Sequence, residues 1–309
     1  MSRVCFNSMA LIHLFRRCNQ KCVFCSYPAD AKAEGGGCLA AWLKEISKMK
    51  PGLVQISGGE PLLADFGDLI KVIAFCARTG RTVELQTNGV LIAGMAAGEL
   101  KLLVHALGPA GYLNLNFPAH NAALDLKITG TACAFAARRK AVKKLLALGA
   151  KVRLTHVVSA LNYKKTAAFA AFAIKNFKND VRLQFSFIKG IGRAEGSRFM
   201  PEYREAAPYL LKALDLCGKK GLKCDVDHIP PCFLDRHRAR SVDVAKMRAG
   251  VKGPHLVEKK KVAECKGCDF SRLCPGPRKD YIAVHSLLFP KRKSNGREKQ
   301  RKVTESKRK

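Results

Sequence analysis

Short apolar runs alternate with longer Ala-, Leu- and Lys-rich runs along the first 220 residues of the chain. The short runs are typical of β-strands, and the longer runs are typical of amphipathic helices. Gly and Pro punctuate them, as at Pro51-Gly52 and Gly149. We predict strands over 9–15, 53–57, 82–86, 112–117, 151–158 and 181–188, and helices over 39–49, 65–77, 96–107, 132–148, 164–176 and 201–216.

Six strands separated by helices predict an α/β fold with a parallel sheet and right-handed crossovers. Ligands of such sheets bind at the carboxyl ends of the strands. Three polar segments follow the first three strands: a cysteine-containing stretch, Gly58–Pro61 and Thr87–Gly89. We therefore expect these segments to meet at one mouth of the sheet.

The regular alternation stops beyond residue 223, where prolines appear and further cysteines gather. The length of 309 residues leaves room for one large domain and one small one. We predict an α/β region over 1–220, a cysteine-rich region over 221–289, and a disordered basic tail over 290–309.

Cys18, Cys22 and Cys25 form a C-x₃-C-x₂-C spacing after the first predicted strand. Three thiolates cannot complete a four-cysteine zinc site alone. They can bind three irons of a [4Fe–4S] cluster, because cysteine thiolates are the usual cluster ligands. The fourth iron would then be open to a small molecule, which favours a reactive site over a structural one.

A second cysteine group lies near the C-terminus. Cys265, Cys268 and Cys274 have the spacing C-x₂-C-x₅-C, and Cys232 precedes them by 33 residues. Four thiolates suit either a zinc ion or an iron–sulfur cluster. Either Cys217 or Cys224 could replace Cys232 as the fourth ligand.

Three features together resemble the radical S-adenosylmethionine (SAM) superfamily. They are the first cysteine spacing with Phe24 before its last cysteine, the sequence Gly58-Gly59-Glu60-Pro61 after the second strand, and the strand–helix order over residues 8–195. The resemblance implies a partial (β/α)₆, TIM-like barrel. It also implies a [4Fe–4S] cluster on the first three cysteines, with SAM bound at the open iron. In that family an electron from the cluster cleaves SAM, and a 5′-deoxyadenosyl radical abstracts hydrogen from the substrate.

The resemblance also implies which residues contact SAM. Glu60 would accept a hydrogen bond from the SAM ammonium group, and the two preceding glycines would allow close backbone approach. Arg153 could pair with the SAM carboxylate, although a buried polar group at a strand needs a partner in any case. The implied cofactor-binding residues are Phe24, Gly58, Gly59, Glu60, Thr87, Asn116 and Arg153.

The second cysteine group resembles the twitch or SPASM-type extensions of radical SAM enzymes. The resemblance implies an auxiliary [4Fe–4S] cluster, and four cysteines suffice for one, so the shorter twitch form fits better. Structural zinc remains open, because sulfur ligands suit both metals. Relatives with such extensions modify peptides, oxidise a side chain of a target protein, or make cofactors.

The chain is strongly basic, with a formal charge of +32. The segment 291–309 contributes +8 of this, from ten Lys and Arg against two Glu, so the bias extends over the whole chain. Such a field attracts anions, including RNA, which could bind the tail without sequence choice. Aromatic residues make up only 7% of the chain, so a base-stacking platform is not evident.

These features leave three candidate functions. The first is a radical SAM maturase or oxidoreductase acting on a peptide or protein side chain. The second is a radical SAM enzyme acting on RNA or a nucleotide-derived precursor. The third, a non-catalytic zinc-bearing nucleic-acid adaptor, leaves Gly58-Gly59-Glu60 unexplained. The enzyme functions need a reductant such as a ferredoxin or flavodoxin. We expect a cytoplasmic protein without a membrane partner, since no signal peptide and no run of roughly 18 apolar residues is evident.

Overall fold

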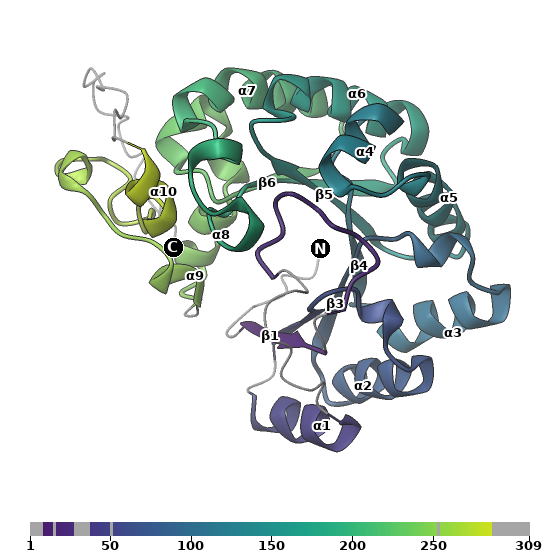
Figure 1. Cartoon of the computed structure of the whole chain (residues 1–309). Helices are drawn as coiled ribbons and strands as arrows, with labels where there is room; N and C mark the ends of the chain where they lie inside the picture. Colours follow the sequence, from purple (N-terminus) through teal and green to yellow (C-terminus); the bar gives the residue numbers. More distant parts are fainter. Residues whose placement is uncertain (1–8, 15–16, 28–37, 50–51, 252–253, 286–309) are drawn as a thin grey trace, which may run out of the picture.

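The computed structural model describes residues 9–14, 17–27, 38–49, 52–251 and 254–285, so the predicted basic tail lies outside the described residues. Within them, one parallel sheet holds seven strands in chain order (Figure 1). The strands are β1 (Met9–His13), β2 (Leu53–Ser57), β3 (Thr82–Thr87), β4 (Tyr112–Asn116), β5 (Val152–Val158), β6 (Val181–Phe187) and β7 (Cys224–Asp227).

Every strand pairs in parallel with the next, and no pairing joins β7 back to β1 among the described residues. The sheet curves around a central space, and helices cover its outer side (Figure 1). The predicted α/β fold with a partial, TIM-like barrel is therefore confirmed.

The helices connect the strands and flank the C-terminal segment. They are α1 (Leu39–Lys48), α2 (Phe66–Arg78), α3 (Ala97–Leu107), α4 (Ala122–Thr129), α5 (Ala134–Ala147), α6 (Thr166–Phe177), α7 (Tyr203–Lys219), α8 (Val242–Arg248), α9 (Pro254–Val257) and α10 (Lys279–Val284). Most boundaries fall within two residues of the sequence prediction.

Helix α4 is an addition to the prediction, which places only one helix between β4 and β5. Asn121 caps it, because the Asn121 side chain accepts a hydrogen bond of 2.9 Å from the backbone N–H of Leu124. Gly130 ends it in the left-handed conformation, with φ of 63°. Its eight residues are few for a periodic apolar pattern to reveal.

Strand β7 carries the sheet past residue 220, where the sequence suggests that the barrel region ends. Its register places Cys224 beside Leu183 and Val226 beside Phe185 on β6. The strand has only four residues, two of them aspartates, so it lacks the apolar run by which the other strands are predicted. Pairing with β6 makes it a strand.

Alternation along each strand separates the apolar core from the polar interior of the barrel. In β5, Leu154 and Val158 are fully buried between sheet and helices, whereas Arg153 and Thr155 face the central cavity. Strands β3 and β4 place Glu84 and further polar residues on the same interior face. Many of the side chains that line the inside of the barrel are therefore polar.

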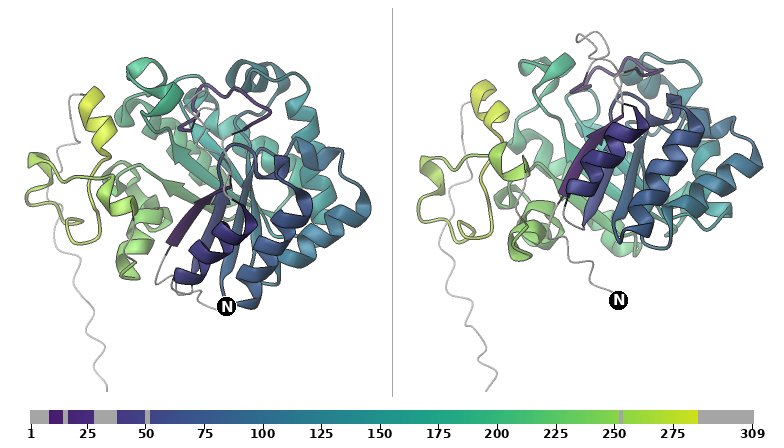
Figure 2. Two further views of the ribbon diagram at one scale, coloured as in Figure 1. Left: turned by 60° about the horizontal axis from the view of Figure 1, so that its bottom comes forward. Right: turned by 90° about the horizontal axis from the view of Figure 1, so that it is seen from below.

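Residues 254–285 form a C-terminal segment on one side of the barrel, remote from the blue helices α1–α3 (Figure 2). The segment folds back on itself through an antiparallel bridge between Lys259 and Arg278. The ring of Tyr281 stacks on that of Tyr203 in α7, with 3.6 Å between centroids. None of the described helices is long and apolar enough to cross a membrane.

Candidate active site

A cavity of about 370 Å³ opens at the carboxyl ends of the strands. Cys18, Cys22 and Cys25 line it from one side, and Gly58 and Gly59 reach it from the loop after β2. Its size falls within the range of small-molecule sites, roughly 300 to 1,000 Å³. The three segments that the sequence predicts to meet at one mouth do meet there. The predicted SAM contacts that line this cavity are Phe24, Gly58, Gly59, Thr87, Asn116 and Arg153.

Backbone contacts fix the cysteine loop, residues 17–27, against two distant parts of the chain. The N–H groups of Lys21 and Val23 donate to the C-terminal carbonyls of α4 at 3.1 and 2.9 Å. The carbonyl of Cys25 accepts from the N–H of Arg193 at 2.9 Å. Gly192 also packs against this carbonyl, and a Cβ at Gly192 would lie only 2.5 Å from the oxygen. The loop after β6 therefore requires glycine where it meets the third cysteine.

Asn88, which follows β3, joins the cysteine loop through its side chain. Its Nδ2 donates to the Oδ1 of Asn19 at 2.6 Å and lies 3.9 Å from the Sγ of Cys18. The backbone N–H of Glu60 donates to the carbonyl of Arg17 at 2.8 Å. The loops after β1, β2 and β3 are thus one hydrogen-bonded unit beneath the cysteines.

Glu60 lies behind this unit, because its side chain is buried and does not line the cavity. Its carboxylate accepts hydrogen bonds from the hydroxyl of Thr87 (2.6 Å) and from the N–H groups of Asn88 (2.7 Å) and Leu62 (3.2 Å). Burial raises the pKa of Glu60, although these hydrogen bonds oppose the shift. The predicted contact between Glu60 and SAM stays a prediction, and in this structure the carboxylate oxygens bind the chain itself.

The glycines before Glu60 provide the surface that faces the cavity. Gly58 has φ of 125°, which side chains with a Cβ rarely adopt. The tight turn that directs Glu60 inward therefore needs glycine at this position. The same turn leaves the backbone of Gly58 and Gly59 accessible from the cavity.

Asn116 and Arg153, two of the predicted SAM contacts, have different surroundings. Asn116 ends β4, and its Oδ1 is buried without a hydrogen-bond partner among the described residues. Arg153 is the second residue of β5, forms an ion pair with Glu84, and lies 4.9 Å over the ring of Tyr112. The amide of Asn116 can therefore accept a ligand hydrogen bond, whereas the charge of Arg153 is already matched.

Glu84 is an interior residue that the sequence analysis missed. Besides Arg153, the hydroxyl of Tyr112 (2.6 Å) and the amides of Gln55 (3.0 Å) and Asn114 (2.7 Å) donate to its carboxylate. Burial alone would raise the pKa of Glu84, but the ion pair and these hydrogen bonds outweigh it, so the pKa is lowered. Glu84 is thus an ionised anchor for the polar floor of the cavity.

Arg138 on α5 is the second residue that sequence reasoning missed. Its side chain is fully buried, pairs with Asp125 of α4 at 2.5 Å, and donates to the amide oxygen of Gln20 at 2.9 Å. It also donates to the carbonyl of Asn88 at 3.0 Å. Neighbouring Arg139 and Lys140 give this helix a basic pattern, so nothing in the sequence separates Arg138 from a solvent-exposed arginine.

The first cysteine group fits a [4Fe–4S] cluster with one open iron. Among the described residues, no three Cys, His, Asp or Glu side chains surround a single metal-ion position. A cluster does not need such an arrangement, because each thiolate binds a different iron. Burial raises the pKa of Cys22 to about 12, and the pKa of Cys18 is also raised. Iron would offset this cost by binding the thiolate form.

The second cysteine group shares one electrostatic neighbourhood. Burial raises the pKa of Cys232 to about 12, and the nearby thiols of Cys274, Cys268 and Cys265 raise it further. Cys274 accepts a hydrogen bond of 3.3 Å from the N–H of Gly276. These four thiols are the ones predicted to form the second metal site, and their metal stays a prediction.

Cys217 and Cys224, the two alternatives to Cys232 as fourth ligand, lie in a different environment. Cys217 of α7 and Cys224 of β7 hydrogen-bond to each other. The guanidinium of Arg240 lies 3.1 Å from the sulfur of Cys224. This geometry favours Cys232 as the fourth member of the second group.

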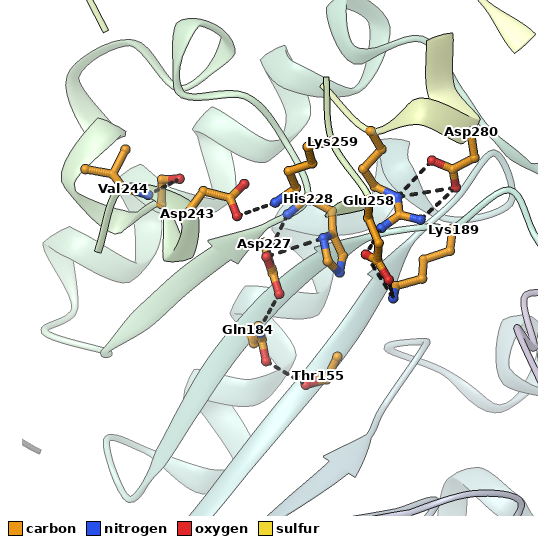
Figure 3. A network of polar contacts seen from close by, with 12 residues as sticks. Thr155, Gln184, Lys189, Asp227, His228, Asp243, Val244, Glu258, Lys259 and Asp280 are labelled. Carbon is orange, nitrogen blue, oxygen red and sulfur yellow. Dashed lines mark hydrogen bonds and ion pairs between the residues drawn. The ribbon is translucent and has the colours of Figure 1, made fainter. Parts of the chain in front are cut away.

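A polar network joins the C-terminal segment to the mouth of the barrel (Figure 3). Lys189, at the end of β6, pairs with Glu258 at 3.0 Å, and Glu258 also pairs with Arg278 at 2.5 Å. The N–H of Gly190 donates to Asp280 at 2.6 Å. Since Lys189 lines the cavity, the C-terminal segment supports one of its walls.

His228 follows β7 on the same wall and has φ of 66°, in the left-handed region that is uncommon for residues other than glycine. Its Nδ1 lies 3.5 Å from Asp227. Burial lowers the pKa of His228 to about 3; Asp227 opposes the shift, and the nearby cations Lys259, Lys189 and Arg278 add to it. The ring is therefore neutral near pH 7 and can act as a hydrogen-bonding group toward the cavity.

The fold is an α/β partial barrel whose cavity is lined by three cysteines. The radical SAM superfamily model matches residues 12–173, just over half of the chain. The chain belongs to the radical SAM superfamily, which confirms the family prediction; the twitch or SPASM subgroup stays a prediction.

Among curated proteins, the chain is similar to the PqqA peptide cyclase of Methylocella silvestris, with 25% identity over 233 residues. The match covers 74% of this chain and 60% of the cyclase. It is also 34% identical over 94 residues to the 7-carboxy-7-deazaguanine synthase of Hyperthermus butylicus, covering 30% of this chain and 40% of that protein. The chain therefore spans only part of the length of these relatives.

Among solved structures, Streptococcus suis SuiB bound to S-adenosylmethionine has a TM-score of 0.65 and 14% identity, covering 91% of this chain and 74% of SuiB. The structure titled native anSMEcpe with bound AdoMet and Kp18Cys peptide has a TM-score of 0.62 and 18% identity, covering 90% of each chain. These two similarities show a shared fold.

Proposed function

We propose that the protein cleaves SAM at a [4Fe–4S] cluster held by Cys18, Cys22 and Cys25 and uses the resulting radical to abstract hydrogen from a peptide or protein side chain. The observation that carries the proposal is the convergence of these three thiols with Gly58 and Gly59 on one polar cavity. In such a site the reduced cluster supplies the electron that cleaves SAM.

The residues of the chain then bind, orient and shield. Gly58 and Gly59 offer backbone groups to SAM, and the unpartnered Oδ1 of Asn116 offers an acceptor. Glu60 fixes the glycine turn, because its carboxylate ties the loop after β2 to Thr87 and Asn88. Glu60 is therefore needed to hold the two glycines in place, and this role does not require Glu60 to contact SAM.

Two observations support a peptide or protein substrate. The match to the PqqA peptide cyclase covers 74% of this chain, more than twice the coverage of the matched synthase. The four C-terminal thiols also form one electrostatic neighbourhood, which suits an auxiliary [4Fe–4S] cluster of the twitch type. Such a cluster could accept the electron that the substrate loses in an oxidation, and a ferredoxin or flavodoxin would reduce the first cluster.

A nucleotide-derived substrate is the second candidate. The similarity to the deazaguanine synthase supports it, as does 33% identity over 119 residues to a probable GTP 3′,8-cyclase of Pyrobaculum aerophilum. The charge of +32 would also attract a phosphorylated substrate or RNA. These matches cover 37% of this chain or less, so they support the common SAM chemistry more than the substrate.

The first experiment tests SAM cleavage. The protein is purified without oxygen, reconstituted with iron and sulfide, reduced with dithionite and given SAM, and 5′-deoxyadenosine is measured. We expect product from the wild type and from Cys38→Ala, which changes an exposed cysteine that does not line the cavity, and only background from Cys22→Ala. Equal background from all three proteins would refute the proposal.

The second experiment compares substrates. The reconstituted wild type receives either a mixture of random-sequence synthetic peptides or GTP, and 5′-deoxyadenosine and new product masses are measured. A peptide mass change that requires SAM supports the first candidate. A GTP-derived product without peptide modification would replace it with the second.

A further inference from the structure

Cys217 and Cys224 are two neighbouring thiols that neither proposed metal site uses. Cys217 lies in the last turn of α7, Cys224 is the first residue of β7, and six residues separate them in the chain. Both are buried, and neither lines the cavity. Their side chains are close enough to hydrogen-bond to each other. Two adjacent thiols outside the metal sites have the placement that a disulfide needs.

The guanidinium of Arg240 contacts both segments that carry these thiols. Its Nη1 donates to the Sγ of Cys224 at 3.1 Å and to the carbonyl of Cys224 at 3.3 Å. Its Nη2 lies beside the residue that follows Cys217, since a Cβ at Gly218 would be 3.5 Å from it. The N–H of Leu222 donates to the carbonyl of Cys217 at 2.9 Å and closes the turn between α7 and β7. The end of the helix and the start of the strand are therefore held together beside one positive charge.

The two sulfurs differ in acidity. The pKa of Cys224 is lowered, because the thiol of Cys217 donates a hydrogen bond to it and Arg240 attracts the thiolate, and these effects outweigh burial. Asp225 opposes the shift, whereas Arg182 adds to it. The same hydrogen bond, together with burial, raises the pKa of Cys217. Since the thiolate is the form that attacks a disulfide, Cys224 is the nucleophile of the pair.

The pair lies where two elements end, and this position controls access to it. Strand β7 is the last in sheet order, and among the described residues its outer side is joined by one isolated bridge, between Val226 and Ser241. The turn before it contains Gly221, with φ of 70°. Ends of elements and loops open at a lower free energy than core strands. Exposing Cys224 to a small oxidant therefore costs less than unfolding the barrel.

We infer that Cys217 and Cys224 are a redox-active pair that closes to a reversible disulfide, with Cys224 as the attacking thiolate. The oxidant is a low-molecular-weight disulfide. The thiolate of Cys224 attacks it, forms a mixed disulfide and releases one thiolate. Cys217 then loses its proton to that thiolate, attacks the sulfur of Cys224 and releases the second thiolate. Two cysteines are oxidised, and one disulfide is reduced to its two halves. The inference does not depend on the proposed function.

The test uses the full-length protein with its metal sites reconstituted, at pH 7. Oxidised glutathione is added, the reaction is stopped with acid, and the remaining free thiols are blocked with N-ethylmaleimide. Digestion with trypsin and an Asp-specific protease separates Cys224 from Cys232, since Asp225 and Asp227 lie between them. Mass spectrometry then identifies each disulfide-linked and each glutathione-linked peptide. The thermal unfolding of each variant is measured beside the wild type, so that only folded variants are compared.

We expect a peptide that links Cys217 to Cys224 in the wild type, and dithiothreitol should remove the link. Cys217→Ser should trap glutathione on Cys224, because the second step then lacks its nucleophile. Cys224→Ser should leave Cys217 unmodified. Arg240→Met should slow formation of the link about threefold, because greater nucleophilicity offsets part of the lost thiolate. The matched control is Cys76→Ser, which removes another fully buried thiol and should leave the link unchanged.

Absence of the link from the folded wild type would overturn the inference, and so would a link that forms only in urea. Glutathione trapped on Cys217 in Cys224→Ser, with none on Cys224 in Cys217→Ser, would overturn the assignment of the nucleophile. Loss of the link in Cys76→Ser would show that thiol exchange is not confined to this pair, and would also count against the inference.

Discussion

The loop with Cys18, Cys22 and Cys25 and the segment with Cys265 and Cys268 are fastened to the sheet by different kinds of contact. Behind the first loop lie fully buried groups, above all the pair of Arg138 and Asp125. The C-terminal segment combines a buried pair between Lys259 and Asp243 with a partly exposed pair between Lys189 and Glu258, whose side chains are 31% and 33% exposed. Buried pairs resist water and salt, whereas exposed pairs contribute little. Each region therefore has one ion pair shielded from water, and the C-terminal segment differs in using an exposed pair where it meets the cavity wall.

The largest expected difference between the two regions concerns SAM cleavage itself. Cys22→Ala should abolish 5′-deoxyadenosine formation, because it would remove a ligand of the proposed cluster with the open iron. Cys268→Ala should leave the SAM-dependent product measurable and reduce iron from about eight to about four atoms per chain, as the loss of one of two four-iron clusters requires. A wild type with four iron atoms that Cys268→Ala leaves unchanged would contradict the auxiliary cluster.

The second prediction compares the two buried arginines of these regions. Arg138→Met should lower the free energy of unfolding by about 3–5 kcal/mol, because Asp125 would stay buried and unpaired. Arg278→Met should cost about 2 kcal/mol, as expected for hydrogen bonds to charged groups, since Glu258 keeps its contact with Lys189 and Asp280 keeps the N–H of Gly190. Urea unfolding measures both. Equal losses would show that the C-terminal segment is held as firmly as the cysteine loop.

Single hydroxyl groups provide a finer comparison. The hydroxyl of Thr87 donates to the buried carboxylate of Glu60 at 2.6 Å, and that of Tyr281 accepts from the backbone N–H of Tyr203 at 2.9 Å. We expect about 2 kcal/mol of destabilisation for Thr87→Val and about 1 kcal/mol for Tyr281→Phe, because a hydrogen bond to a charged group is the stronger. Thermal unfolding of the two variants beside the wild type gives the order, and the reverse order would contradict the comparison.

The sequence predicts best those strands whose bounds are set by neighbouring residues in the chain. Strand β2 agrees with the prediction at both ends, because Pro51-Gly52 and Gly58-Gly59 bound its apolar run. Strand β7 is missed because pairing with β6, and no apolar run of its own, defines it.

The candidate site divides in the same way. The spacing of the cysteines and glycines in the sequence is enough to predict them as cavity residues. Their supports do not, because Gln20 and Arg138 are 118 residues apart, and Glu84 has its partners on three other strands. Such contacts exist only once the sheet has formed, so a sequence pattern cannot reveal them.

The smallest predicted effect is a difference in how acid acts on the two regions. Burial would raise the pKa of Glu258, but Lys189 and Arg278 outweigh it and lower the pKa to about 2. Its contribution to stability is therefore complete above the ordinary pKa of 4.5 and is lost as pH falls from 4.5 toward 2. Glu60 has a raised pKa, so its ionised form costs stability, and acid removes that cost.

Hydrogen exchange, corrected for intrinsic rates, should therefore show residues 254–285 losing protection between pH 4.5 and about pH 2 before the cysteine loop does. The effect should correspond to less than about 1 kcal/mol, because Glu258 is partly exposed and screened by solvent. Glu258→Gln should lower the protection of this segment at pH 5 and remove most of its pH dependence. Simultaneous loss of protection in both regions would show that they open as one cooperative unit, and the difference in fastening would then have no consequence for local opening.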